Sequence, residues 1–318
     1  MNIRSIRVMV LCLLLLCAGK AEAQKFIFTP QWTAQAQFAG YYVAVEKGFY
    51  REAGIDVEIV HPTLTQSALN RILSGESQAT TLQLCEAIVI MDSGVPLVNI
   101  LQTSMNNGLV IVSRRDENPI RQKGIRVGTW SAGFDQMAVC LSSSEGLDYQ
   151  WIPVSSGINL FLSGAIDASL TMSYNELNQL KEAGVEITEN NIFRLGDHGY
   201  NIQEDGIYMT RDYYESHKEQ ADRFAAASRR GWEWAVEHPD ETLDIVMDYV
   251  QRNHIATNRI LQKLMLEEIL RLQVDRDSGQ REFRLRPDMV ETANDLMLKN
   301  QLILRKISYE ELLDRPTR

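Results

Sequence analysis

The chain has 318 residues, of which 45% are hydrophobic and 23% are charged, and its formal net charge at pH 7 is −10. This composition is typical of a globular protein, and the length suits one large domain or two medium ones. The acidic excess argues against nucleic acid or an anionic membrane as a partner, because both attract basic surfaces.

The first residues have the pattern of a secretory signal. Arg4 and Arg7 form a basic start, and residues 8–18 are an apolar run too short to span a bilayer. Residues 21–23, Ala-Glu-Ala, supply a small-x-small cleavage site. We therefore expect a signal peptide over residues 1–23 and export to the periplasm, with a lipid anchor as an open alternative.

The cysteines favour buried thiols over a disulfide. Cys12 and Cys17 lie in the signal segment, which leaves Cys85 and Cys140 in apolar helical patterns far apart in the sequence. No spacing typical of a zinc site occurs, and we expect neither a metal nor a cofactor.

Strands and helices alternate in the first part of the chain. Strand patterns at residues 25–28 and 57–60 flank a helix that runs from Tyr42 to Gly54, a glycine suited to a helix C-terminus. The pattern then predicts helices at residues 66–73 and 84–92 and strands at residues 97–102 and 109–113.

A second lobe is predicted after the polar stretch at residues 114–123. It begins with a strand at residues 125–128 and continues as alternating strands and helices. A strand at residues 206–210 then returns to the first lobe, and amphipathic helices follow, interrupted by a polar loop at residues 275–284.

We therefore predict an α/β fold of two lobes joined by two hinge crossings, near Ser113 and Gly206. Residues 24–113 and 206–318 form the first lobe, and residues 114–205 form the second. A cleft between two hinged lobes is the usual clamp for a small ligand.

Residues 40–57 carry the most informative motif of the chain, G-x-Y-x-A-x-x-K-G-[FY]-[FY]-x-x-x-G-[IL]-x-V. The run resembles the opening of the periplasmic solute-binding proteins that serve thiamine-pyrimidine precursors, alkanesulfonates, taurine and related solutes. This resemblance implies the type II periplasmic-binding-protein fold with a helical C-terminal part, and the role of substrate-binding component of an ABC importer. The residues that match are Gly40, Tyr42, Ala44, Lys47, Gly48, Phe49, Tyr50, Gly54, Ile55 and Val57.

The loop before this run supplies candidate ligand-binding residues. Gln31 and Trp32 follow a strand end that faces the predicted cleft, and an indole offers a flat apolar face to a planar ligand. A core position between helix and strand is the alternative for Trp32. Tyr42 is a further candidate, although it also fits the buried face of the helix.

Residues 127–134 predict a strand, a turn of small residues and a helix start. Ser131 and Gly133 would leave backbone N–H groups free to meet an acceptor or an anion, and an ordinary capped turn is the alternative. The candidate ligand-binding residues of this segment are Trp130, Ser131, Gly133 and Phe134.

Residues 173–176, Ser-Tyr-Asn-Glu, resemble the Thr-Tyr-Asn-Glu segment of the pyrimidine-precursor binders. The resemblance implies that Tyr174 lies against the ring and that Glu176 pairs with the aminopyrimidine edge. A carboxylate can accept from an exocyclic amine and share a proton with the adjacent ring nitrogen. The alternative for Glu176 is a carboxylate in the first turn of a helix, which the helix dipole favours.

Three residues, at two places in the first loop, depart from the pattern of those binders. Gln31 stands where many of them have an acid, and Gln37-Phe38 stands where they have Asn-His. A larger flat heterocycle such as a flavin is therefore an alternative ligand, as are an alkanesulfonate and taurine. The scarcity of Arg in the candidate turns makes the sulfonates less attractive.

We predict a monomeric, non-enzymatic protein that captures a thiamine-related pyrimidine precursor or a similar planar heterocycle in the interlobe cleft and delivers it to an ABC permease in the inner membrane. The alternatives are an enzyme like the pyrimidine synthases and a sensor that presents its ligand to a membrane kinase. Trp130-Ser131-Ala132-Gly133 approaches a nucleophile elbow, but Thr129 replaces its first glycine and no His partner is evident. We therefore reject a hydrolase.

Overall fold

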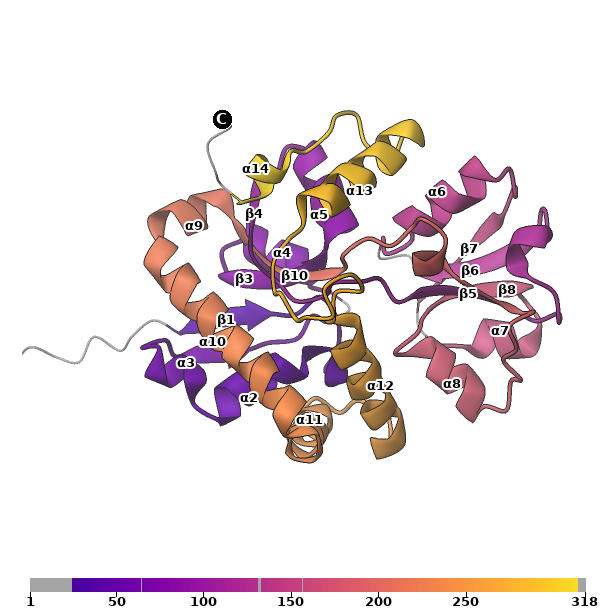
Figure 1. Cartoon of the computed structure of the whole chain (residues 1–318). Coiled ribbons are helices and arrows are strands. Elements are labelled where there is room, and N and C mark those ends of the chain that lie inside the picture. The colour runs from indigo at the N-terminus through magenta and orange to yellow at the C-terminus, as the bar shows by residue number, and fades with distance from the viewer. Residues whose placement is uncertain (1–24, 64, 131–132, 156, 314–318) are drawn as a thin grey trace, which may run out of the picture.

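The computed structural model describes residues 25–63, 65–130, 133–155 and 157–313. Within these residues, two five-stranded sheets form two lobes that lie side by side (Figure 1). The expected signal peptide, residues 1–23, and the candidate residue Ser131 lie outside the described residues.

The first lobe is built on a sheet with the strand order β2-β1-β3-β10-β4. Strand β1 pairs in parallel with β2 and β3, whereas β10 is antiparallel to both β3 and β4. The sheet is therefore completed by a strand that follows the whole second lobe in the sequence. The strands are β1 Phe26–Thr29, β2 Val57–Ile59, β3 Ala79–Gln83, β4 Leu97–Gln102 and β10 Asp205–Thr210.

The second lobe is built on a sheet with the order β7-β6-β8-β5-β9. Strand β6 is parallel to β7 and β8, and β5 is antiparallel to β8 and β9. The strands are β5 Leu109–Ser113, β6 Arg126–Trp130, β7 Gln150–Val154, β8 Ala168–Met172 and β9 Ile192–Arg194.

One predicted lobe boundary is wrong. Strand β5 belongs to the second sheet, so the first crossing spans residues 103–108 rather than lying near Ser113. The polar residues 114–123 are instead a connection within the second lobe. An all-apolar strand suits the interior of either sheet, so its pattern does not assign it to one lobe. The second crossing leads into β10 close to Gly206, as predicted.

The first helical segment is two helices rather than one. Gly48 has a φ of 78°, a left-handed conformation that a glycine adopts without steric cost, and it separates α2 from α3. Gly54 is also left-handed and follows the end of α3. The helices of this part are η1 Ala36–Phe38, α2 Ala39–Glu46, α3 Phe49–Glu52, α4 Ala68–Leu73 and α5 Leu84–Asp92.

The helical C-terminal part is confirmed, and its long helix α10 packs directly on α2. A Cβ added to Gly231 would lie 2.0 Å from the carbonyl oxygen of Gly40, and a Cβ on Gly40 would overlap the ring of Trp232. The motif residue Gly40 therefore allows this close approach. The helices are α9 Arg211–Ser216, α10 Lys218–Glu237, α11 Pro239–Arg252, α12 Arg259–Leu272, α13 Pro287–Lys299 and α14 Tyr309–Leu313.

The two lobes touch on either side of the cleft. Helix α12 lies beside α8 of the second lobe (Figure 1), and α13 packs near α6. The Ser173 hydroxyl donates to Glu268 at 2.6 Å, and Asn258 donates to Glu182 at 2.8 Å, so hydrogen bonds bridge the lobes. The second-lobe helices are η2 Pro119–Arg121, α6 Gln136–Ser144, α7 Asn159–Ser163, α8 Glu176–Glu182 and η3 Leu195–Asp197.

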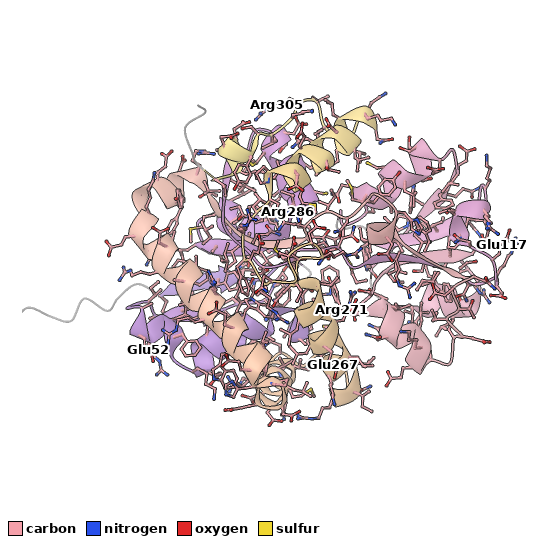
Figure 2. All side chains as sticks on the ribbon, in the orientation of Figure 1. Glu52, Glu117, Glu267, Arg271, Arg286 and Arg305 are labelled. Atoms are coloured by element: carbon pink, nitrogen blue, oxygen red, sulfur yellow. The ribbon has the colours of Figure 1, made fainter. Side chains whose placement is uncertain are left out.

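The interior holds the two cysteines that follow the signal segment, and charged side chains lie on the surface. Cys85 and Cys140 are both free and buried, as predicted. Charged side chains such as Glu52 and Glu117 extend from the outer surfaces of the two lobes (Figure 2). In the part of the chain that the structure describes, none of the helices has both the length and the hydrophobicity of a membrane span.

Candidate ligand-binding site

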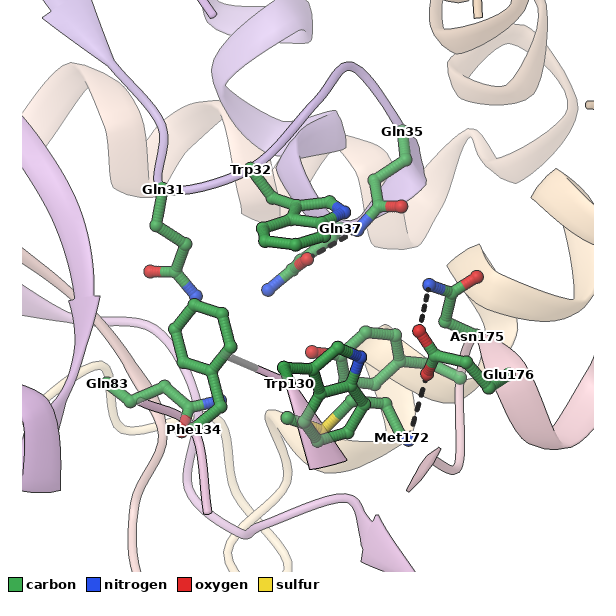
Figure 3. Close-up of a pocket in the computed structure, with 11 residues that line it drawn as sticks. Gln31, Trp32, Gln35, Gln37, Gln83, Trp130, Phe134, Met172, Asn175 and Glu176 are labelled. Atoms are coloured by element: carbon green, nitrogen blue, oxygen red, sulfur yellow. Dashed lines mark hydrogen bonds between the residues drawn. The ribbon is translucent and has the colours of Figure 1, made fainter. Parts of the chain in front are cut away.

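A small cavity lies between the two lobes (Figure 3). Its volume is about 30 Å³, far below the roughly 300–1,000 Å³ of a small-molecule site, so a ligand would enter only with the lobes further apart. Both lobes contribute to its wall. The lining residues are Gln31, Trp32, Gln35, Gln37 and Gln83 from the first lobe, and Trp130, Phe134, Met172, Tyr174, Asn175 and Glu176 from the second.

The loop after β1 forms most of the first lobe's share. Because β1 is parallel to its neighbours, its carboxyl end opens toward the edge where α/β sheets bind ligands. The Gln31 N–H donates to Thr81 Oγ1 at 2.8 Å, which holds the loop to β3. Trp32 follows and is half-buried at the cavity. The sequence placed both side chains at this edge.

Three further glutamines line the cavity. They were not predicted as ligand-binding residues from the sequence. Gln37 and Gln35 are joined by a hydrogen bond of 2.6 Å between Gln35 Nε2 and Gln37 Oε1, and Gln83 ends β3. All three are buried. The repeated glutamines of the segment Gln31-Trp-Thr-Ala-Gln-Ala-Gln were the available signal, because buried amides must find partners.

His61 supports the Trp32 loop from behind. Its Nδ1 lies 2.7 Å from the Trp32 carbonyl oxygen, and its Nε2 lies 2.9 Å from the Tyr42 hydroxyl. A carbonyl oxygen only accepts, so Nδ1 carries the proton, and Nε2 of the neutral ring accepts from Tyr42. Burial lowers the pKa of His61 to about 4, although the bond to Trp32 raises it in part.

Tyr42 does not reach the cavity. Its side chain is fully buried and stacks on Tyr249, with ring centroids 4.0 Å apart. The helical spacing fitted both a cleft position and a core position, and the structure has the core one. Tyr42 therefore acts on the loop only through His61, and we leave it out of the proposed contact set.

Aromatic rings form much of the second lobe's share. Phe134 makes edge-to-face contacts with Trp130, at a centroid distance of 6.4 Å, and with Trp32 of the first lobe, at 5.9 Å. The second of these contacts crosses the cleft. The cavity therefore has rings on both sides, which is the arrangement that holds a flat apolar ligand.

Tyr174 and Glu176 lie at the same cavity, next to the carboxyl end of β8. Glu176 is the first residue of α8, and only 6% of its surface is exposed. Its carboxylate accepts from the Met172 N–H at 3.1 Å and from Asn175 Nδ2 at 3.0 Å (Figure 3). Burial nevertheless raises the pKa of Glu176. The residue is thus both a first-turn carboxylate and part of the cavity wall.

The backbone N–H site proposed for the turn after β6 stays a prediction. Gly133 has a φ of 87°, and its carbonyl oxygen accepts from Gln136 Nε2, but it is not among the residues that line the cavity. Ser131 lies outside the described residues. Helix α6 begins only at Gln136.

The charge of the wall is one-sided. Among the described lining residues, Glu176 is ionisable as an acid and none is a Lys, an Arg or a His. The other polar groups are neutral: amides, a phenol and the indole N–H groups of Trp32 and Trp130. A neutral or cationic ligand suits this wall, whereas an anionic ligand would lack a basic partner.

These features define a two-lobed α/β fold with an interlobe cavity, the fold of periplasmic binding proteins. The periplasmic aliphatic sulphonate binding protein SsuA from Escherichia coli has this fold, with a TM-score of 0.65, 13% identity and 93% of each chain covered. At that identity the likeness concerns the fold alone.

The family described as NMT1/THI5 like matches residues 35–242, more than half of the chain, and the chain belongs to this family. A formylaminopyrimidine-binding protein from Halalkalibacterium halodurans is 25% identical over 225 residues, which are 68% of each chain. The riboflavin-binding protein RibY from Chloroflexus aurantiacus is 23% identical over 260 residues, which are 78% of this chain and 72% of the relative.

Proposed function

We propose that this protein is the periplasmic substrate-binding component of an ABC importer and captures a thiamine-related pyrimidine precursor or a similar planar heterocycle without converting it. The observation that carries this proposal is the interlobe cavity, in which aromatic rings from both lobes accompany one buried carboxyl group and several amides. The rings would hold the faces of a flat ligand, and the polar groups would meet its edges.

The proposed contacts follow from the lining residues. Trp32, Trp130 and Tyr174 would lie against the ring, and Glu176 would accept from an exocyclic amine while sharing a proton with the neighbouring ring nitrogen. The raised pKa of Glu176 favours such sharing, because an unpaired buried carboxylate is costly. Phe134 and Gln31 would close the remaining sides.

The charge of the cavity wall separates the candidate ligands. The cavity of about 30 Å³ is too small for either a one-ring compound or a flavin, so both would need the lobes further apart. The lack of basic groups among the described lining residues disfavours alkanesulfonates and taurine. The relatives named for formylaminopyrimidine and riboflavin support a heterocycle, and riboflavin is the second candidate, for a more open cleft.

The cellular role follows from the class of protein. One solved structure with this fold is the ligand-binding component of an ABC-type import system, which supports an ABC permease as the partner. We propose that the mature protein acts in the periplasm as a monomer that closes on its ligand by rotation about the two crossings.

A thermal-shift screen of the purified protein tests the proposal. Formylaminopyrimidine should raise the unfolding midpoint in a dose-dependent way, because a ligand that binds only the folded state stabilises it. Riboflavin should give a smaller shift, and taurine and nitrate none. Mass spectrometry of the released ligand should show it unchanged. A shift with taurine alone, or a chemically altered pyrimidine, would contradict the proposal.

A further inference from the structure

Asp205 lies behind the cavity at the hinge, where β10 begins. Its backbone carbonyl accepts from the N–H groups of Thr103 and Ser104, so this residue connects the two crossings. Its carboxylate is buried and holds two side chains of the cavity wall. Gln31 Nε2 donates to Oδ1 at 2.9 Å, and Gln37 Nε2 donates to Oδ2 at 2.7 Å.

This geometry fixes which end of each amide faces away from Asp205. An ionised carboxylate only accepts hydrogen bonds, so it binds the NH₂ ends and leaves the oxygens for other partners. Gln31 Oε1 is shielded from solvent and has no partner. Gln37 Oε1 accepts from Gln35 Nε2, so the orientation of Gln37 also orients Gln35 (Figure 3).

We propose, resting on the function proposed above, that Asp205 is a positioning residue for ligand selection. In its ionised form it sets the glutamine side of the cavity as hydrogen-bond acceptors, and so selects heterocycles that present N–H donors. Asp205 is not among the residues that line the cavity, so it acts on the ligand through Gln31, Gln37 and Gln35.

Protonation of Asp205 would undo this arrangement. Burial raises the pKa of Asp205 to about 6, while the hydrogen bonds from Gln37 and Gln31 lower it in part. A neutral carboxyl group carries one O–H donor, which can be satisfied by a glutamine only after that amide turns its oxygen inward. The turned amide then presents NH₂ to the cavity side. Affinity for an amino-substituted ring should therefore fall below about pH 6.

The ionisable groups around Asp205 come from several elements and are all acids or phenols in the described part of the chain. Burial raises the pKa of Glu86 to about 8 and that of Glu204 well above its usual value. The charge of Asp205 is therefore supported by the two amide donors rather than by a cation. The neighbouring groups are Tyr41 of α2, Glu86 of α5, Tyr174 after β8, and Glu204 and Tyr208 beside or within β10.

Calorimetric titration of Asp205→Asn with formylaminopyrimidine tests the inference. The NH₂ group of the new Asn faces the NH₂ group of Gln31 or Gln37, so that glutamine amide must turn its oxygen toward position 205. The ligand then loses one hydrogen bond, and its affinity at pH 7 should fall about tenfold. Wild-type affinity should fall about tenfold more than that of Asp205→Asn between pH 7 and pH 5. The ligand and Glu176 change protonation in both proteins. The ratio of the wild-type affinity to the Asp205→Asn affinity therefore reports the protonation of Asp205.

Two further variants distinguish an effect on the orientation of the glutamine amides from a general loss of folding. In the double variant Asp205→Asn/Gln37→Glu the carboxylate moves to position 37. There it accepts both from the amide introduced at position 205 and from Gln35, and affinity at pH 7 should recover. The Gly108 N–H donates to Glu204 Oε1 at 3.0 Å. The variant Glu204→Gln keeps an acceptor for this bond, so its affinity should depend on pH as that of the wild type does.

Several results would overturn the inference. They are parallel pH profiles for the wild type and Asp205→Asn, a folded double variant that does not recover affinity, and a wild-type affinity that is flat between pH 7 and pH 5. Each of these leaves the proposed function standing if the wild type binds the pyrimidine. No binding by the wild type at any pH would reject the proposed function itself, and the inference with it.

Discussion

The two lobes contribute different chemistry to the same cavity. The first lobe supplies four glutamines and Trp32, and the second supplies three aromatic rings, a methionine, an amide and the carboxyl group of Glu176. The glutamine side is held by long-range bonds, from Asp205 and from His61. The carboxyl side is held locally, by Met172 and Asn175.

We propose that this difference makes closure of the lobes necessary for binding. Neither lobe alone offers rings on both faces of a flat ligand together with partners for its edges. A ligand that meets both surfaces stabilises the closed arrangement by its differential affinity, which is how a hinged binding protein responds. The bridging bonds Ser173–Glu268 and Asn258–Glu182 show that the structure has its lobes in contact.

The largest expected effect is on the free energy of unfolding and comes from His61, which holds the Trp32 loop of the first lobe. The folded pKa of His61 is about 4, below the unfolded value of 6.5, so the fold favours the neutral ring. Its contribution to stability is complete above pH 6.5 and is lost as the pH falls toward 4, by about 3 kcal/mol in total. Chemical denaturation should show the wild type losing this much relative to His61→Asn between pH 7 and pH 4. Equal losses of stability in the two proteins would show that the neutral ring of His61 does not stabilise the fold.

The next effect concerns the charge of the second lobe. Glu176→Gln removes the ionisable acceptor, and a bond to a charged group contributes about 1.5–3 kcal/mol, so affinity for formylaminopyrimidine should fall tenfold to a hundredfold. Glu189→Gln, the same change at an exposed position of the second lobe, should leave affinity unchanged and serves as the control. Unchanged calorimetric affinity in Glu176→Gln would remove this residue from the contact set.

The smallest effect concerns the indole of the first lobe. Trp32→Ala should weaken binding by about tenfold or more, from roughly 1.4 kcal/mol of lost ring contact. Trp234→Ala is the matched control, because Trp234 stacks on His238 of the same lobe away from the cavity. If both variants bind like the wild type in calorimetry, Trp32 does not contact the ligand.

The sequence predicted most of the fold because its elements alternate clearly. The bounds predicted for α5, β4 and β5 match the structure, and the return strand is β10. The lobe assignment of β5 failed because its buried apolar residues fit the middle of either sheet. The single helix predicted to Gly54 failed because Gly48 takes a left-handed conformation within it.

The candidate site could be predicted only in part. The rings of Trp32, Trp130 and Tyr174 stood at strand ends, so the sequence pointed to them. Gln37 was missed because its partner Asp205 is distant in the sequence, at the start of β10, and only the folded chain brings it to the loop; Gln35 in turn bonds Gln37. Tyr42 was ambiguous because a short helix has two apolar faces.

The most direct measurement is a crystal structure of the protein with formylaminopyrimidine. We expect the ring between Trp32 of the first lobe and the Trp130 and Tyr174 side of the second, with its amino edge on Glu176. Ligand density outside this cavity, or a ring that contacts one lobe only with the lobes closed, would contradict a flat heterocycle held between the two.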